Sequence, residues 1–174
     1  GPVISEAAQR HVLEAQEHLA KCGGRVLVPC ADPGLPGFHV TAGVTEVDSF
    51  LDAPDEEIFG PLVQVCRVAN LEEAITQANA TRYGLAASVF SRDASVYQEV
   101  SRGLKVGCLN WNTGTAGASS ALPFGGAGRS GNHRPAAAFA QDFCAWPVAS
   151  LEESSESAVV PEGMQWDDRW LRDG

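Results

Sequence analysis

Apolar residues occur along this chain in two patterns, a helical repeat and short continuous runs. Between residues 6 and 22 they return every three or four positions, as at Val12 and Leu19, which predicts an amphipathic helix. The pair Gly23-Gly24 follows directly, and glycine commonly ends a helix. Short apolar runs further along the chain have no helical period and are bounded by turn residues. They predict strands.

The predicted strands and helices alternate. We expect strands over residues 25–28, 62–68, 85–90 and 106–109, weaker strands over 38–41 and 44–47, and helices over 70–79 and 93–103. The strand over 62–68 has few polar breaks, which is typical of a strand covered on both faces. This order predicts an α/β fold, a mainly parallel sheet with flanking helices.

The longest irregular stretch runs from Leu109 to Arg134. It is rich in glycine and small residues and has neither a helical nor a strand period, so we expect an ordered loop without helix or strand. Trp111, Leu122 and Phe124 give this loop apolar side chains to bury. From the residues alone, two interpretations stay open: a structural loop that crosses a sheet edge, or a loop that binds a ligand through its backbone amides.

Two more elements are expected after this loop. Pro135 is placed to begin a helix over 136–141, and residues 143–149 alternate as in a strand. Residues 152–174 form an acidic, serine-rich tail that we expect to be mobile.

Composition narrows the class of protein. The net charge is −10, which argues against a nucleic-acid partner because such binding needs clustered Lys and Arg. No apolar run is long enough to cross a membrane. The five cysteines are scattered and have neither disulfide-framework nor zinc-site spacing, and the histidines are equally dispersed. We therefore expect no metal, and reduced thiols in a cytoplasmic protein.

Three motifs occur in an informative order. They are Glu-Glu-Ile-Phe-Gly-Pro at 56–61, Asn-Ala-Thr-Arg-Tyr-Gly-Leu at 79–85, and Pro-Phe-Gly-Gly at 123–126 with Ser-Gly at 130–131. In this order and spacing the chain resembles the NAD(P)-dependent aldehyde dehydrogenases, from its first residue to about Leu151. The resemblance is to the C-terminal part of such a chain.

The resemblance implies roles for residues in these motifs. Glu57 matches the carboxylate that accepts hydrogen bonds from the nicotinamide ribose of NAD, and Phe59 matches an aromatic beside the nicotinamide ring. Phe124 matches a wall of the aldehyde pocket. Without the motif, Glu57 would be read as an exposed loop acid, and both phenylalanines as packing residues. Arg82 and Tyr83 are interpreted as structural.

A second set of residues is implied to hold the substrate. Gly117, Ala118, Ser119 and Ser120 match a loop whose backbone amides bind a carboxylate in relatives acting on amino-acid semialdehydes. His133 and Arg134 are the candidates for a further carboxylate, because a guanidinium binds one bidentately. The alternatives are a plain flexible loop and a surface pair that contributes little. The expected partner is therefore a small aldehyde that carries carboxylates.

The resemblance also shows what this sequence lacks. The family's nucleophilic Cys and general-base Glu lie in motifs upstream of Gly1, so no catalytic residue is assigned here. The expected organisation is a partial catalytic domain over 1–143, an oligomerisation strand over 144–151 that joins a neighbouring subunit, and the tail over 152–174. The alternatives are an inactive binding or assembly module, and a dehydrogenase for another semialdehyde.

Overall fold

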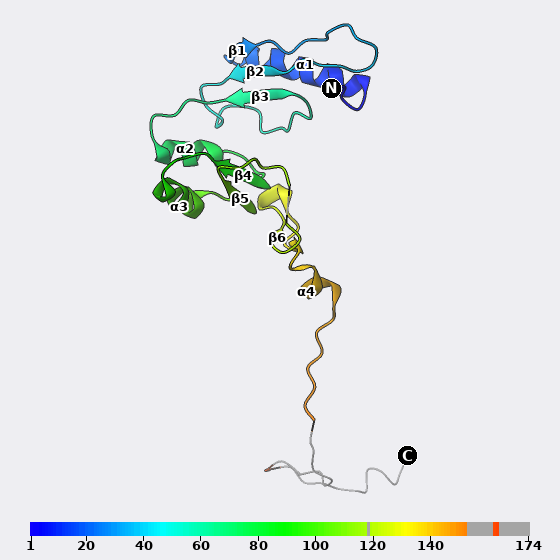
Figure 1. The fold of residues 1–174 in the computed structure, drawn as a ribbon, viewed down its shortest axis with the longest axis vertical. Helices are drawn as coiled ribbons and strands as arrows, with labels where there is room; N and C mark the ends of the chain where they lie inside the picture. The colour runs from blue at the N-terminus through cyan, green and yellow to red at the C-terminus, as the bar shows by residue number, and fades with distance from the viewer. Residues whose placement is uncertain (118, 153–161, 164–174) are drawn as a thin grey trace.

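The structure is a computed structural model that describes residues 1–117, 119–152 and 162–163. Its helices are α1 (Glu6–Lys21), α2 (Leu71–Ala78), α3 (Ala94–Gly103) and α4 (Ala140–Cys144), with a 3-10 turn η1 (Gly128–Ser130). Its strands are β1 (Arg25–Val28), β2 (Gly43–Glu46), β3 (Leu62–Val65), β4 (Ala86–Val89), β5 (Cys108–Trp111), β6 (Pro123–Phe124) and β7 (Ala136–Ala137). The α/β fold with flanking helices is confirmed (Figure 1).

The strands pair in three ladders. β1, β2 and β3 form a sheet in which β2 is antiparallel to β1 and parallel to β3. β4 and β5 form a second, parallel pair, and β6 and β7 a short antiparallel one. The larger strands are thus mainly parallel, as the alternation of strands and helices predicts.

Helix α1 packs on the first sheet through its apolar stripe. Ser5 caps its first turn by accepting a hydrogen bond from Ala8 N at 3.2 Å. Val12 and Leu19 are buried and lead a core cluster that also contains Val47 and Leu62. The core of this chain therefore lies between α1 and β2–β3.

Helices α2 and α3 lie beside the second pair of strands (Figure 1). Asn70 caps α2 by accepting from Glu73 N at 2.9 Å, and Asp93 caps α3 by accepting from Ser95 N at 2.8 Å. Asn79 joins the helices' far ends, because its amide donates to Gly103 O at 2.8 Å. The two helices predicted from the sequence are confirmed here.

The expected loop over 109–134 is corrected in part. Residues 109–111 belong to β5, Pro123–Phe124 pairs with β7, and η1 forms one turn. Pairing was not foreseeable because two-residue strands leave no period. The apolar anchors are also less buried than expected: Leu122 is 63% exposed, and Trp111 and Phe124 are each 39% exposed in this chain.

The elements after Pro135 differ from the prediction. Residues 136–137 form strand β7 rather than a helix start, and helix α4 begins only at Ala140. Phe143 and Cys144 end α4 instead of beginning a strand, and residues 145–152 have no regular structure. A strand needs a partner edge, and the described residues pair no strand with this segment. Pairing of 144–151 with a neighbouring subunit stays a prediction. Figure 1 shows this segment leading away from the body.

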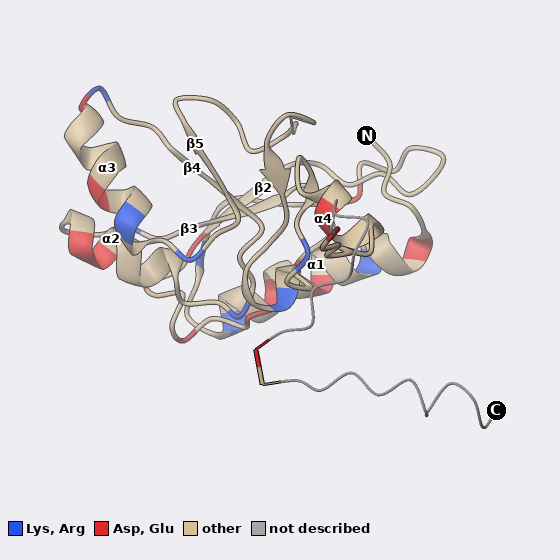
Figure 2. Ribbon diagram, turned by 90° about the horizontal axis from the view of Figure 1, so that it is seen from below, with Lys and Arg blue, Asp and Glu red and all other residues tan. Residues whose placement is uncertain are grey.

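Charged residues are frequent along the helices and also occur in the loops (Figure 2). Strands β3, β4 and β5 contain no charged residue. Among the described helices, none combines the length and apolarity that crossing a membrane requires.

Candidate functional site

The irregular segment between β2 and β3 carries Glu57 and Phe59, and both of its ends are fixed. At the first end Asp55 accepts hydrogen bonds from Thr81 Oγ1 at 2.5 Å and from Arg82 N at 3.0 Å. Its carboxylate also pairs with Arg82 Nε at 2.9 Å. The segment is thereby tied to the residues that follow α2, and Arg82 has the structural role expected of it.

These contacts stabilise the ionised form of Asp55. Three donors reach one carboxylate, which lowers the pKa of Asp55 from 3.8 to about 2. The hydrogen bond to the Asp55 carboxylate in turn raises the pKa of Arg82. Asp55 was not singled out from the sequence, because an acid in an acidic loop is usually exposed and unpaired.

The second end of the segment is fixed by close packing. Gly60 lies against Val12 of α1, so that a Cβ atom at this position would overlap Val12 Cγ2. Ile58 is half-buried and packs on the same core. A residue larger than glycine would push the segment away from α1.

The third motif packs on the second through the backbone. Arg129 N donates to Arg82 O at 2.8 Å, and Ala127 N donates to Gly84 O at 2.8 Å. Gly84 N in turn donates to Ser130 Oγ at 3.1 Å. The three motifs that are far apart in the sequence therefore interlock in one place, with the residues around Arg82 between the other two.

Glu57 and Phe59 both point away from the core in this fixed segment. Glu57 is exposed, and its carboxylate accepts no hydrogen bond from the described residues. Phe59 is 73% exposed, although phenylalanine is usually among the buried residues. An acceptor and an aromatic ring held two residues apart on a rigid segment can contact a hydroxyl-bearing ligand and a flat ring.

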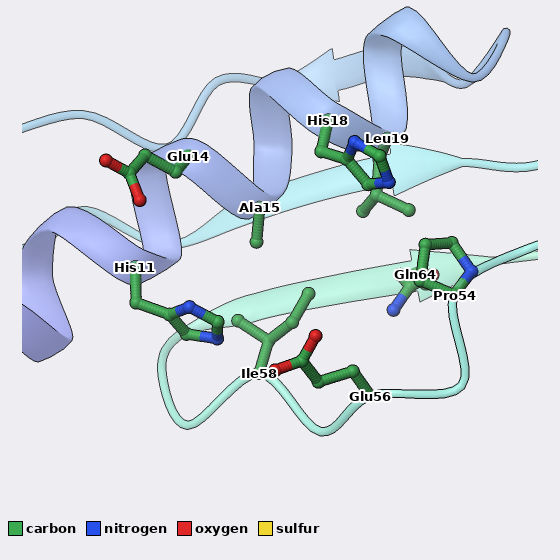
Figure 3. Close-up of a pocket in the computed structure, with 9 residues that line it drawn as sticks. All are labelled: His11, Glu14, Ala15, His18, Leu19, Pro54, Glu56, Ile58 and Gln64. Atoms are coloured by element: carbon green, nitrogen blue, oxygen red, sulfur yellow. The ribbon is translucent and has the colours of Figure 1, made fainter.

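A cleft of about 190 Å³ separates this segment from α1 (Figure 3). His11, Glu14 and His18 line it from α1, and Glu56 lies opposite them. From the sequence the histidines were judged to be dispersed, and His11 and His18 were not linked to this segment. Their spacing of seven, which puts both on one face, was the available signal.

The loop after β5 is held by two asparagines. Asn110 Nδ2 donates to Gly114 O at 2.8 Å, and Asn112 Nδ2 donates to Ser91 O at 2.8 Å. Gly117 has φ +96°, a backbone conformation that residues other than glycine rarely adopt. Ala118 lies outside the described residues.

The remaining substrate candidates fall in two places. Ser119 and Ser120 precede β6, and Ser119 O accepts from Leu122 N at 3.3 Å. His133 and Arg134 precede β7 and are exposed. Because β6 and β7 are antiparallel, the residues before each strand lie at opposite ends of this pair.

A tight turn presents His133 and Arg134. Asn132 Oδ1 accepts from Arg134 N at 3.0 Å, and His133 has φ +63°. Arg134 forms no ion pair with the described residues. Its guanidinium is thus available to an anion. Phe124 lies between the two groups, in β6.

All five cysteines are free. Cys30 is buried, and burial raises the pKa of its thiol, which is the opposite of what a nucleophile needs. Within the described ranges, no three Cys, His, Asp or Glu side chains gather as metal ligands.

Comparison with known proteins agrees with this arrangement of motifs. The model of the aldehyde dehydrogenase family matches residues 1–146. This chain belongs to the aldehyde dehydrogenase family. Two curated relatives carry the name N-succinylglutamate 5-semialdehyde dehydrogenase: one from Burkholderia cenocepacia (strain HI2424) is 48% identical over 156 residues, and one from Yersinia pestis (strain Pestoides F) is 45% identical over 152. These matches cover 88% and 87% of this chain.

A solved structure shares the fold. The aldehyde dehydrogenase of Mycobacterium tuberculosis in complex with NAD⁺ is 30% identical, with a TM-score of 0.72 over 80% of this chain and 29% of its own. The present chain likewise spans only 32% and 30% of the two curated relatives. It therefore corresponds to about a third of a complete family member.

Proposed function

We propose that this chain is the C-terminal segment of an NAD-dependent dehydrogenase that oxidises N-succinylglutamate 5-semialdehyde to N-succinylglutamate in arginine breakdown. The observation that carries the proposal is the 48% identity to the Burkholderia relative of that name over 156 residues. The availability of Arg134 on its tight turn supports the choice of a substrate with several carboxylates.

The geometry of the segment over 55–60 suits NAD. The free carboxylate of Glu57 can accept from two ribose hydroxyls at once, and the exposed ring of Phe59 offers a flat apolar surface beside the nicotinamide. Bound NAD would supply the hydride acceptor. Anchoring by Asp55 and Gly60 would hold both side chains in place, so that little ordering remains for cofactor binding.

The substrate's carboxylates would be held by the rest of the candidate site. We assign one to the backbone amides of Gly117, Ala118, Ser119 and Ser120. The other is assigned to Arg134, with His133 as a second donor. Phe124 would line the aldehyde pocket between them. Two separated anchors suit a substrate whose carboxylates lie at opposite ends of a flexible chain.

The covalent step needs a nucleophile from another part of the protein. In the family a thiolate attacks the aldehyde, and a base-activated water later releases the acid. The buried thiol of Cys30 does not fit this role. None of the five cysteines lies in a motif that matches the family's nucleophile, so we expect the purified 174-residue chain to bring about no aldehyde oxidation with NAD.

The second candidate function is assembly without catalysis. The chain would then be an inactive assembly module that keeps the fold and pairs with other subunits through residues 144–151. The extended course of 145–152 away from the body favours such a role. The coding sequence before Gly1 discriminates: a continuous frame with a Cys motif supports the enzyme, and a start codon at that point supports the module.

The substrate assignment can be tested in a hybrid enzyme. This hybrid is the Burkholderia relative with its matching 156 residues replaced by those of the present chain. Arg134→Ala in the hybrid should raise KM for N-succinylglutamate 5-semialdehyde by roughly tenfold to a hundredfold, the effect of losing a charged hydrogen bond. KM for an aliphatic aldehyde should stay unchanged.

Arg92→Ala is the matched control. Arg92 is also exposed, and it lies in the turn before α3, outside the residues assigned to the substrate. It should leave KM for both aldehydes unchanged. An equal loss on both aldehydes in the Arg134 variant would reject the carboxylate role.

A further inference from the structure

The cleft between α1 and the segment over 55–60 has a lining that the proposed dehydrogenase function leaves unused. It measures about 190 Å³. His11 and His18 line it from α1 (Figure 3). Gln64 lines it from β3, and Glu56 lies opposite the helix. None of its nine lining residues is Lys or Arg. Its polar groups are therefore mostly hydrogen-bond acceptors, and its carboxylates are negative.

Two of these acceptors have no partner in the described part of the chain. The carboxylate of Glu56 forms no ion pair there. Gln64 is half-buried, and its Oε1 atom is buried without a hydrogen-bond partner. A buried oxygen of this kind is uncommon in proteins, because the hydrogen bonds that it made to water are lost. A ligand that donates hydrogen bonds would replace them.

The two imidazoles add acceptors on the helix side. Their spacing of seven residues puts His11 and His18 on one face of α1. A neutral imidazole has one ring nitrogen that accepts a hydrogen bond. His18 Nε2 lies 3.7 Å from Cys22 Sγ, so its Nδ1 atom remains for a ligand. Among the described residues, His11 forms no ion pair with Glu56 across the cleft.

The rest of the cleft is apolar. Ala15 and Leu19 contribute from α1, and Pro54 and Ile58 from the facing segment. Such a surface favours the burial of methylene groups. It does not suit a bare metal ion, and no three Cys, His, Asp or Glu side chains gather as metal ligands in the described ranges. The lining therefore fits a ligand that joins a donor group to a hydrocarbon part.

Volume and charge narrow this ligand further. A cavity of roughly 150 Å³ holds one benzene molecule. A cleft of about 190 Å³ is slightly larger, so it has room for roughly six or seven non-hydrogen atoms. The chain has a net charge of −10, which attracts cations to its surface.

We propose that this cleft binds a small primary amine in its ammonium form, with an aliphatic chain of about four to six carbons. An ammonium group donates three hydrogen bonds and accepts none, which matches the acceptors of the lining. Glu56 would supply the opposite charge, and Gln64 Oε1 and the imidazoles the further acceptors. The chain of the amine would lie along Ala15 and Ile58. This site is independent of the substrate assignment, and binding can be measured without turnover.

Three probes of one shape separate charge from hydrocarbon. Pentylamine, 1-pentanol and pentanoate share a chain length and differ in the charge of the polar end. Each is titrated at constant pH into the 174-residue chain, and NMR follows the ring signals of its four histidines. Pentylamine should shift the signals of His11 and His18 with a Kd of about 1 mM or below. The signals of His39 and His133, which do not line the cleft, should stay in place.

Other results would contradict the amine site. Equal shifts by all three probes would show an apolar cleft without charge selectivity. Shifts of all four histidines by pentylamine would show general attraction to an acidic protein. Displacement of pentylamine by NAD⁺ would assign the cleft to the cofactor. Each of these outcomes overturns the proposal, whereas shifts confined to His11 and His18 and caused by the amine alone support it.

Two variants with matched controls locate the amine. Glu56→Gln should weaken pentylamine binding about fivefold, the upper range for an exposed ion pair. Glu99→Gln makes the same change of charge on α3, outside the cleft, and should leave the affinity unchanged. Equal affinities of these two variants would remove Glu56 from the site and contradict the proposal.

The second variant fills the space of the hydrocarbon chain. Ala15→Leu should weaken binding by about tenfold or more, because the added carbons occupy the cleft. Ala20→Leu, at an exposed position of α1 outside the lining, is its control and should bind normally. Unchanged binding by the Ala15 variant would overturn the proposal. If its spectrum shows that this variant is unfolded, Glu56→Gln decides.

Discussion

The contact between Gly60 and Val12 offers a quantitative test of how the segment with Glu57 and Phe59 is positioned. Gly60→Ala places a methyl group on Val12 Cγ2. Overpacking of this kind costs about 1–3 kcal/mol, and the lower entropy of the unfolded alanine chain offsets about 0.4–1 kcal/mol. We expect a net loss in the free energy of unfolding of about 1–2 kcal/mol.

The second variant creates the space that the first one needs. Val12 is fully buried, and Val12→Ala removes two carbons at about 0.8 kcal/mol each, with a cavity on top. It should cost about 2–3 kcal/mol. In this background the new methyl would lie 3.4 Å from the Cβ atom at position 12, an ordinary van der Waals contact.

The double variant should therefore be no less stable than Val12→Ala alone. The expected coupling is about 2 kcal/mol in favour of the pair. Urea unfolding of the four proteins, followed by circular dichroism and tryptophan fluorescence, measures it, provided that the two signals coincide. Losses that add within about 0.5 kcal/mol would refute the packing of this segment on α1.

Two further predictions concern the same segment. The pKa of Asp55 is about 2 in the folded chain, against an ordinary value of 3.8 that applies to the unfolded chain. The unfolded chain therefore binds the proton more tightly. The stabilisation by Asp55 is present above pH 3.8 and is lost as the pH falls towards 2. Asp55→Asn should lower the Tm at neutral pH and flatten its fall between these limits; an unchanged Tm profile would reject the contact with Arg82. In the hybrid enzyme, Glu57→Gln should raise KM for NAD with every aldehyde, because an amide accepts ribose hydroxyls less strongly than a carboxylate. Glu56→Gln, one residue away, is its control, and equal effects from both would remove the ribose role from Glu57.

Much of the first half of the fold was predictable because its helices are long enough for the spacing of apolar residues to repeat. Apolar residues recur at helical spacing along the sixteen residues of α1. Asn70 and Asp93 are residue types that favour the N-cap position, and they precede α2 and α3. The strand ends were less predictable. β3 was expected to reach Val68 but ends at Val65, because pairing with β2 rather than side-chain character decides where a ladder stops.

The second half was harder for a physical reason. β6 and β7 have two residues each, and their pairing depends on a contact between distant positions that no local period records. The same limit applied to the site. The motifs identified Glu57 and Arg82, but the carboxylate that joins them, Asp55, had no signal of its own in the sequence.

This segment is proposed to complete an N-succinylglutamate 5-semialdehyde dehydrogenase. NADH formation from that aldehyde and NAD⁺ tests it most directly, measured on the purified 174-residue chain, the hybrid enzyme and the unchanged Burkholderia relative. We predict no turnover by the chain alone, and a hybrid whose kcat/KM lies within about tenfold of that of the relative. Turnover by the isolated chain, or a folded hybrid that oxidises simple aldehydes but not the succinylated one, would contradict the account.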